Sequence, residues 1–157
     1  MYLTHLECPK CGKTHETEHP IQLCPCGAPL LVRYDLKRIG GSLKKKDLAN
    51  RQPSLWRYRE LLPVRREENI VSLGEGMTPL LKLDRLGPEV GIPDLYLKDE
   101  GIIPTGTFKA RGAAVGVSRA LELGIKVLAM PTNGNAGASW AAYCAAAGMS
   151  RSMNDRA

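Results

Sequence analysis

The chain has 157 residues, of which 43% are hydrophobic and 24% charged, and its formal net charge is +6 at pH 7. This hydrophobic share is normal for a globular protein and excludes wholesale disorder. The length fits one ordinary domain, or a small module followed by part of a second domain. No basic start with an apolar stretch opens the chain, and the longest apolar tract, residues 136–148, is too short for a bilayer. We therefore expect a cytoplasmic protein without a membrane partner.

The positive charge raises the question of nucleic-acid binding. Lys44, Lys45 and Lys46 form the one dense basic cluster, and no aromatic residues alternate with it. A solvated linker explains this cluster better than a phosphate-binding surface. A net positive charge equally suits a protein whose small-molecule ligands carry phosphate. A non-catalytic zinc-binding or nucleic-acid-binding module stays as the alternative class of function.

Four of the five cysteines lie in residues 1–34, a segment short of large aliphatic side chains: Cys8, Cys11, Cys24 and Cys26. Two close pairs of thiolates can close a tetrahedral shell around zinc, whose binding energy replaces the missing core. Gly12 and Gly27 follow the pairs, where the chain must turn tightly. A redox pair does not fit, because the Cys-x-x-Cys does not lie between a strand and a helix. We predict a zinc-ribbon-like module.

The second pair, Cys-Pro-Cys, is one residue shorter than the usual metal knuckle. A metal-free ribbon with free thiols therefore stays open as an alternative. His5, His15 and His19 are candidate substitute ligands, although lone histidines near such a site are more often exposed bystanders.

Residues 35–70 are basic and polar, and their larger apolar side chains come late in the segment. We interpret this segment as a connector with a short helix that docks on the following domain. The docking side chains are expected to be Trp56, Tyr58, Leu61 and Leu62.

From residue 71 to 157 the pattern is that of an α/β domain. Apolar spacing predicts strands at 80–83, 95–98 and 126–130, and helices at 107–123 and 135–147. Gly124 and Gly148 end the two helices. Ala114, Val117 and Leu121 share one face of the first helix. Strands that alternate with helices through short links predict a parallel sheet. No strand is predicted after Met149, and Cys144 is expected to fill the core.

Lys109 opens the first of these helices, directly after the turn Pro104-Thr105-Gly106-Thr107-Phe108. A lysine attacks a carbonyl only when its amine is neutral, so its pKa must be lowered, and a helix N-terminus and burial beside Phe108 act in that direction. The threonines are expected to cap the helix. Such a site suits a carbonyl cofactor, whereas a lysine at a helix start is usually only a solvated charge. Gly112 and Gly116 each lower helix stability by ~1 kcal/mol relative to alanine. We therefore expect a neighbouring segment to pack closely against each of them.

A second motif, Thr132-Asn133-Gly134-Asn135-Ala136-Gly137, links a strand to the next helix. Backbone amides at a helix N-terminus favour a carboxylate or phosphate, and the carboxyl edge of a parallel sheet is a usual place for ligands. The spacing excludes a dinucleotide-binding glycine loop. An ordinary turn with a helix cap explains one asparagine but not the cluster.

Four motifs follow one another along the chain, at residues 73–80, 98–100, 104–112 and 133–137. Together they resemble the threonine synthase family of fold-type-II pyridoxal 5'-phosphate (PLP) enzymes, which are tryptophan synthase β-like. The cysteine module is similar to the front end of many members, and the resemblance extends from Cys8 to Met149. The implied fold is a zinc-ribbon-like module followed by an incomplete parallel-sheet α/β domain of PLP fold type II.

The resemblance also implies roles for individual residues. Lys109 matches the lysine that binds PLP covalently and shuttles protons, and Phe108 matches the residue that lies against the cofactor. Asn135 matches the asparagine that hydrogen-bonds the pyridine 3-oxygen. Thr132, Asn133 and Gly134 match the loop that receives the substrate carboxylate. The implied reaction converts O-phospho-L-homoserine and water to L-threonine and phosphate, and full-length relatives are candidates for homo-oligomers.

Three positions depart from the commoner family pattern and leave the substrate open: Ile102-Ile103, Ala110 and Asn133. The alternatives are a threonine or serine dehydratase, a diaminopropionate ammonia-lyase and a cysteate synthase-like enzyme. Two family features are not found in the sequence, namely the glycine-rich loop for the PLP phosphate and the hydroxyl residue opposite the pyridine nitrogen. We therefore expect a truncated, frameshifted or incomplete product that is inactive or nearly inactive alone.

Overall fold

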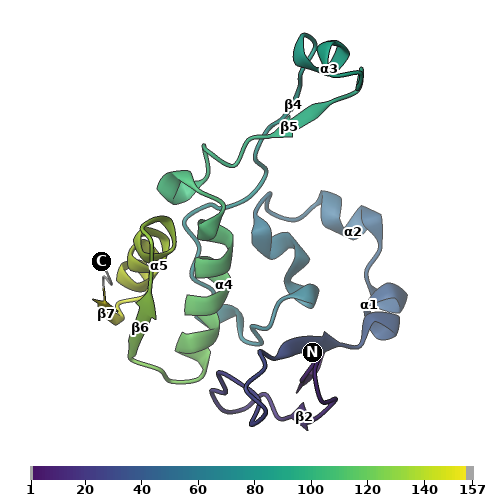
Figure 1. Ribbon diagram of the computed structural model, residues 1–157. Helices are drawn as coiled ribbons and strands as arrows, with labels where there is room; N and C mark the ends of the chain where they lie inside the picture. The colour runs from purple at the N-terminus through teal and green to yellow at the C-terminus, as the bar shows by residue number, and fades with distance from the viewer. Residues whose placement is uncertain (1, 155–157) are drawn as a thin grey trace.

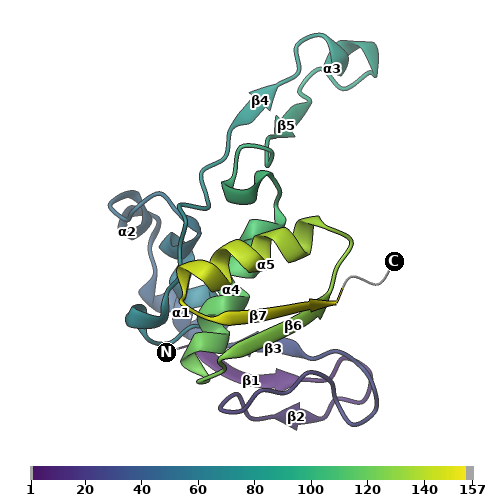
Figure 2. The same cartoon turned by 90° about the vertical axis from the view of Figure 1, so that its left-hand side faces the viewer.

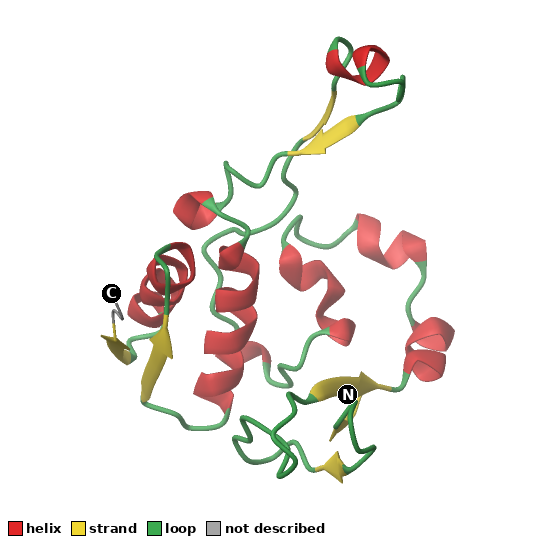
Figure 3. Ribbon diagram, in the orientation of Figure 1, coloured by secondary structure: helices red, strands yellow, loops and turns green. Residues whose placement is uncertain are grey.

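The computed structural model describes residues 2–154. A small sheet forms one end of the molecule, helices fill its middle, and a thin hairpin projects from the opposite end (Figure 1). Helices and irregular segments account for most of the middle, and the short strands lie around it (Figure 3). Among the described residues, no helix is both long enough and apolar enough to span a membrane.

The N-terminal end is an antiparallel three-stranded sheet in the order β2-β1-β3. Its strands are β1 (Leu3–Glu7), β2 (Thr14–His15) and β3 (Leu31–Tyr34). Both predicted glycine turns are present, since Gly12 and Gly27 have φ of +72° and +83°. The Gly12 amide donates to the Cys8 carbonyl at 3.0 Å, and the Gly27 amide donates to the Cys24 carbonyl at 2.8 Å. Each cysteine pair therefore lies on a tight turn.

The connector contains more helix than the sequence analysis predicted. Its elements are α1 (Leu36–Ser42), α2 (Lys45–Ala49) and the 3-10 helices η1 (Leu55–Leu61) and η2 (Glu67–Asn69). Trp56 is buried and Leu62 packs against the core, as expected. The prediction for Tyr58 and Leu61 was wrong, since they are 42% and 41% exposed. The segment η1 is kinked at Tyr58 and Leu62 follows it in extended conformation, so these side chains do not follow one regular helical face.

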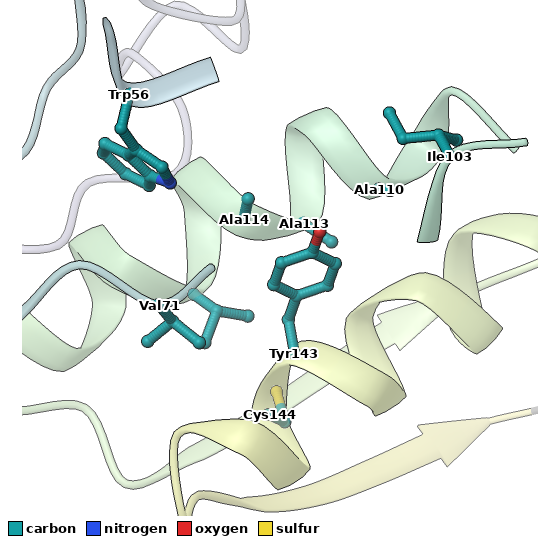
Figure 4. Packing of buried hydrophobic residues seen from close by; sticks show 9 residues of the cluster. Trp56, Val71, Ile103, Ala110, Ala113, Ala114, Tyr143 and Cys144 are labelled. Atoms are coloured by element: carbon teal, nitrogen blue, oxygen red, sulfur yellow. The ribbon is translucent and has the colours of Figure 1, made fainter. Parts of the chain in front are cut away.

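Two helices form the main packing layer: α4 (Lys109–Glu122) and α5 (Asn135–Ala146). Figure 4 shows Trp56, the alanines of α4 and Tyr143 of α5 converging on one cluster. Ala114 and Val117 are fully buried, and Leu121 packs beside them, which confirms the predicted face. Cys144 is buried in the same cluster, as expected.

The two helical glycines of α4 differ. A Cβ on Gly116 would lie 2.4 Å from the Trp140 ring, so the close neighbour predicted there exists. The same prediction for Gly112 was wrong, because a Cβ there would meet nothing within 4 Å. The absence of a side chain at Gly116 thus lets α5 pack closely on α4.

The pair β6 (Val127–Pro131) and β7 (Ser150–Asn154) is parallel, with Val127 opposite Ser150. The helix α5 connects the two strands and lies alongside β7 (Figure 2). The prediction that no strand follows Met149 was therefore wrong. The polar run Ser150–Ser152 gives no apolar alternation, and the strand is decided by the return of the chain after α5 to the free edge of β6.

The projecting hairpin consists of β4 (Leu80–Lys82), α3 (Leu86–Glu89) and β5 (Tyr96–Lys98). Its strands pair antiparallel, with Leu81 opposite Leu97. The prediction that residues 95–98 belong to the parallel sheet was wrong, because β5 pairs with β4 and not with β6. The thirteen residues between the strands, 83–95, lead the chain directly back alongside β4, which gives antiparallel pairing.

The cysteine module contacts the C-terminal end of α4. Arg119 donates to the carbonyl of Thr17, and Arg65 donates to the Thr17 hydroxyl at 2.6 Å. Glu122 accepts from the backbone amides of Arg65 and Arg66 at 2.8 and 2.7 Å. Three segments distant in sequence are thus joined at the end of α4 opposite Lys109.

Candidate functional site

Lys109 is the first residue of α4, as predicted. Its Nζ lies 4.1 Å from the centre of the Phe108 ring. Two expectations for this turn were wrong. Lys109 is exposed rather than partly buried, and the N-cap is Phe108, whose side chain makes no capping bond. The site presents an accessible amine beside an aromatic ring that is itself 57% exposed.

The turn before Lys109 has an unusual backbone. Thr105 has φ of +72° and Gly106 has φ of +67°, so two successive residues are left-handed and only the second is a glycine. For a threonine this conformation costs roughly 1–2 kcal/mol. Pro104, directly before Thr105, begins the 3-10 helix η3 (Pro104–Gly106). Such a cost indicates that contacts elsewhere hold the turn in place.

The predicted carboxylate loop lies at the start of α5. Gly134 is the N-cap with φ of +123°. The Thr132 hydroxyl accepts from the amides of Gly134 and Gly137 at 3.1 and 2.7 Å, so Thr132 caps the helix. A Cβ on Gly137 would lie 2.6 Å from the Thr132 side chain, which explains why this turn contains a glycine. Asn133 and Asn135 are exposed, and their amide groups are accessible to a ligand.

A hydrogen-bonded bridge brings the two predicted regions together. The Thr105 hydroxyl lies 2.8 Å from the Ser139 hydroxyl, and Ser139 also donates to the Asn135 carbonyl at 2.9 Å. The turn that leads to Lys109 is thereby tied to the first turn of α5. An amine, an aromatic ring and a primary amide on these two tied segments are groups that suit a planar aldehyde cofactor, so these residues fit PLP.

An ion pair lies two residues after Lys109. Arg111 donates to Glu100 through Nε at 2.7 Å and Nη2 at 2.8 Å, and the Thr78 hydroxyl donates to the same carboxylate at 2.5 Å. Lys98 donates to the Thr78 carbonyl at 2.5 Å. The Arg111 guanidinium, with the Thr78 hydroxyl, lowers the pKa of Glu100 to about 2. This cluster fastens the base of the projecting hairpin to the first turn of α4.

Glu75 is a fully buried carboxylate. It accepts from Trp56 Nε1 at 2.8 Å, from the Tyr143 hydroxyl at 2.6 Å, from the Ser72 hydroxyl at 3.0 Å and from the Leu73 amide at 2.9 Å. Burial, together with the bond to Glu75, raises the pKa of Tyr143. Four donors compensate the lost hydration of one charge. The connector, the loop before β4 and α5 all meet at this carboxylate.

The four predicted cysteines come together. Their sulfurs all lie within 4.8 Å of one another, with 3.5 Å between Cys8 and Cys26 and 3.7 Å between Cys11 and Cys24. A tetrahedron of metal–sulfur bonds of about 2.3 Å has edges of about 3.8 Å, so this set fits a zinc ion. The Cys11 amide near the Cys8 sulfur lowers the pKa of Cys8 to about 6. The shortened Cys-Pro-Cys pair therefore does not prevent a four-sulfur cluster.

None of the three histidines belongs to this cluster in the described part of the chain. His5 lies 3.8 Å from Glu7 in the sheet, and His15 is in β2. The alternative in which histidines substitute as ligands is thus contradicted, whereas metal occupancy stays a prediction.

The sequence did not predict the buried carboxylate, the ion pair or the bridge to α5. Glu75, Glu100 and Arg111 lay inside the quoted motifs, but no contact was foreseen for them, and Ser139 was not singled out. The one usable signal was Glu75 itself, since an acidic residue between two glycines follows the largely apolar stretch 70–73, where a buried position is expected. Two of the partners of Glu75, Trp56 and Tyr143, are 19 and 68 residues away, which sequence spacing does not report.

A family model described as pyridoxal-phosphate dependent enzyme matches residues 71–153. This match covers more than half of the 157 residues, so the chain belongs to that family. The family description implies pyridoxal phosphate as cofactor, in agreement with the accessible amine of Lys109.

Several curated relatives are threonine synthases. That of Methanocaldococcus jannaschii is 48% identical over 141 residues, which make up 90% of this chain and 35% of the relative. That of Methanosarcina acetivorans is 45% identical over 146 residues, with 92% and 35% covered. That of Halalkalibacterium halodurans is 44% identical over 101 residues, with 61% and 28% covered. The chain thus spans about a third of the length of the relatives it matches.

We predict that Glu75→Gln lowers the free energy of unfolding by about 3 kcal/mol, because an amide nitrogen would face two hydrogen-bond donors in a buried site. Urea denaturation at pH 7 measures this loss. Glu89→Gln, a change at an exposed glutamate of α3, is the matched control and should be nearly neutral. If Glu75→Gln lowers the free energy of unfolding no more than Glu89→Gln does, the role assigned to the buried carboxylate is contradicted.

The low pKa of Glu100 predicts an acid-sensitive contribution to stability. The pKa falls from an ordinary 4.5 to about 2 in the folded state, so the contribution is complete above about pH 4.5 and disappears as the pH falls toward 2. The difference in urea midpoint between the wild type and Glu100→Gln should therefore be constant from pH 7 to 5 and shrink below pH 4.5. A difference that stays constant down to pH 3 would show that Glu100 is not held ionised by Arg111.

Proposed function

We propose that this chain supplies the lysine-bearing part of a threonine synthase-like PLP-dependent lyase, which converts O-phospho-L-homoserine and water to L-threonine and phosphate. The observation that carries the proposal is the bridge from the turn before Lys109 to the start of α5, because it joins the segment that bears the amine and the ring to the segment that bears the Asn135 amide. The names of the relatives favour threonine synthase over the dehydratase, ammonia-lyase and cysteate synthase alternatives.

Each residue of the proposed site has a task that its position supports. The Lys109 amine would hold the aldehyde carbon of PLP and, when released, accept and return protons at Nζ. Phe108 would cover one side of the ring, and the Asn135 amide would donate to the ring oxygen. PLP when bound supplies an electron sink for the amino-acid substrate. A small phosphorylated amino acid also agrees with the net positive charge of the chain.

The substrate carboxylate is assigned to the loop Thr132-Asn133-Gly134. The start of α5 carries the positive end of the helix dipole, which favours an anion. Thr132 acts here mainly through its capping bonds, which fix the loop, whereas Asn133 is exposed and free to reach a ligand. This division of tasks makes Thr132 a support for the substrate loop and Asn133 its contact.

We further infer that residues 1–34 form a zinc-ribbon-like module that binds one zinc ion through Cys8, Cys11, Cys24 and Cys26. Residues 35–70 are assigned to the connector and residues 71–157 to the PLP-dependent domain. The sulfur separations support a tetrahedral zinc site, and the module has few buried apolar side chains of its own. A site of four thiolates also favours a reducing compartment such as the cytoplasm.

Reduction of the PLP complex with borohydride tests the proposed lysine. After brief treatment of the chain with PLP and borohydride, peptide mapping should find the label mainly on Lys109. Lys126, an exposed lysine before β6, is the internal reference, since it has no ring or amide assigned to hold the cofactor. Lys109→Arg should remove the label at that position without raising it at Lys126. Equal labelling of Lys109 and Lys126 would refute the cofactor site.

Turnover is tested in a hybrid enzyme, because the chain matches about a third of its relatives. The matching segment of the Methanocaldococcus jannaschii relative is replaced by that of this chain. We expect phosphate release from O-phospho-L-homoserine, and its loss in the Lys109→Ala hybrid. A hybrid that binds PLP at Lys109 but releases no phosphate would reject the substrate and keep the cofactor assignment.

Elemental analysis of the metal-replete protein is expected to find about one zinc per chain. Cys11→Ser should lower this content strongly, because it removes one thiolate from an exposed corner of the cluster. Cys144→Ala is the matched control, since Cys144 lies in the core away from the cluster and its loss should leave the zinc content unchanged. Zinc-free wild-type protein would refute the site.

A further inference from the structure

We propose that Thr105 and Ser139 are positioning residues that hold Lys109 and Asn135 in one fixed arrangement. The inference rests on the proposed function, because it assigns a purpose to the link between the proposed lysine and the proposed ring-oxygen donor. Neither hydroxyl is given any contact with substrate or cofactor.

The bridge has a definite direction. Ser139 donates its single hydroxyl hydrogen to the Asn135 carbonyl at 2.9 Å. The 2.8 Å contact between the two hydroxyls must then be made by Thr105 as donor and Ser139 as acceptor. The chain of bonds therefore runs from the turn before Lys109 to the backbone of Asn135.

Burial distinguishes the two partners. Ser139 is fully buried on α5, so its acceptor oxygen is shielded from solvent donors, whereas Thr105 lies on an exposed turn. The Thr105 hydroxyl is thus the group that satisfies a buried oxygen from outside α5. Its loss leaves the turn and α5 joined here only by van der Waals contact.

The backbone of the turn supports the same reading. Thr105 is left-handed, a conformation that glycine adopts without strain and threonine does not. A glycine at this position would relax the backbone but could not make the bond to Ser139. A glycine therefore gains stability from the relaxed backbone and loses stability with the hydrogen bond. A variant that is as stable as the wild type but lacks the bond separates a positioning role from a structural one.

Three variants test the proposal. Thr105→Ser keeps the hydroxyl, Thr105→Gly removes it and relaxes the backbone, and Ser139→Ala removes the other partner. The first readout is hydrogen exchange of the backbone amides at residues 133–137, measured without cofactor. The second is the visible circular dichroism of PLP bound at Lys109, which reports whether the ring is held in one orientation.

We expect Thr105→Ser to match the wild type in both readouts. Thr105→Gly should raise amide exchange at residues 133–137 by about fivefold, the fold-change expected for one net hydrogen bond, and should lose most of the dichroism. Its urea midpoint should equal or exceed that of the wild type, so instability cannot explain the loss. Ser139→Ala should resemble Thr105→Gly in both readouts.

The proposal is overturned if Thr105→Gly keeps wild-type exchange and dichroism, or if Thr105→Ser loses them to the same degree. A wild-type protein without any cofactor band at Lys109 would reject the proposed function instead. In that event the exchange of residues 133–137 still decides whether Thr105 and Ser139 join the turn to α5.

Discussion

The buried carboxylate of Glu75 is the interaction on which the arrangement of the helices depends. Its four donors come from the connector, from the loop that precedes β4 and from α5. An ionised carboxylate without donors would cost several kcal/mol in this position, so any arrangement that separates these segments is strongly disfavoured. The alanine-lined contact between α4 and α5 adds apolar burial around the same point. One charge thus selects a single packing among the many that small apolar side chains would allow.

The loop that contains Glu75 connects the buried carboxylate to the region of Lys109. A Cβ on Gly76 would lie 2.8 Å from backbone atoms of Ser54 and Leu55, and the Leu55 amide donates to the Glu75 carbonyl at 2.8 Å. The loop therefore runs in direct contact with the connector. A few residues later Thr78 joins the ion pair of Glu100 and Arg111, which begins at the first turn of α4. The backbone on both sides of Lys109 is consequently anchored, by this ion pair and by the turn that contains Thr105.

Much of the local structure was predictable because it depends on neighbouring residues. The apolar spacing of Ala114 and Val117, the stops at Gly124 and Gly148, and the turns at Gly12 and Gly27 are all confirmed. Predictions failed where the deciding partner is distant. The strand after Met149 forms because β6 offers it an edge, and residues 95–98 pair with β4 instead of the parallel sheet. Similarly, the threonines before Lys109 do not cap α4, since one of them bonds to Ser139 on another helix.

The sequence by itself determined the class of protein, the lysine at the opening of a helix, the asparagine loop and the four thiols with their glycine turns. These features are short motifs whose chemistry is carried by residue type and local spacing. Only the tertiary structure decided that Glu75 is the buried centre, that Glu100 pairs with Arg111, and that Thr105 reaches Ser139. The physical reason is that a hydrogen bond or ion pair gains its strength from burial and from a partner far along the chain. Neither of these can be read from the order of residues around a single position.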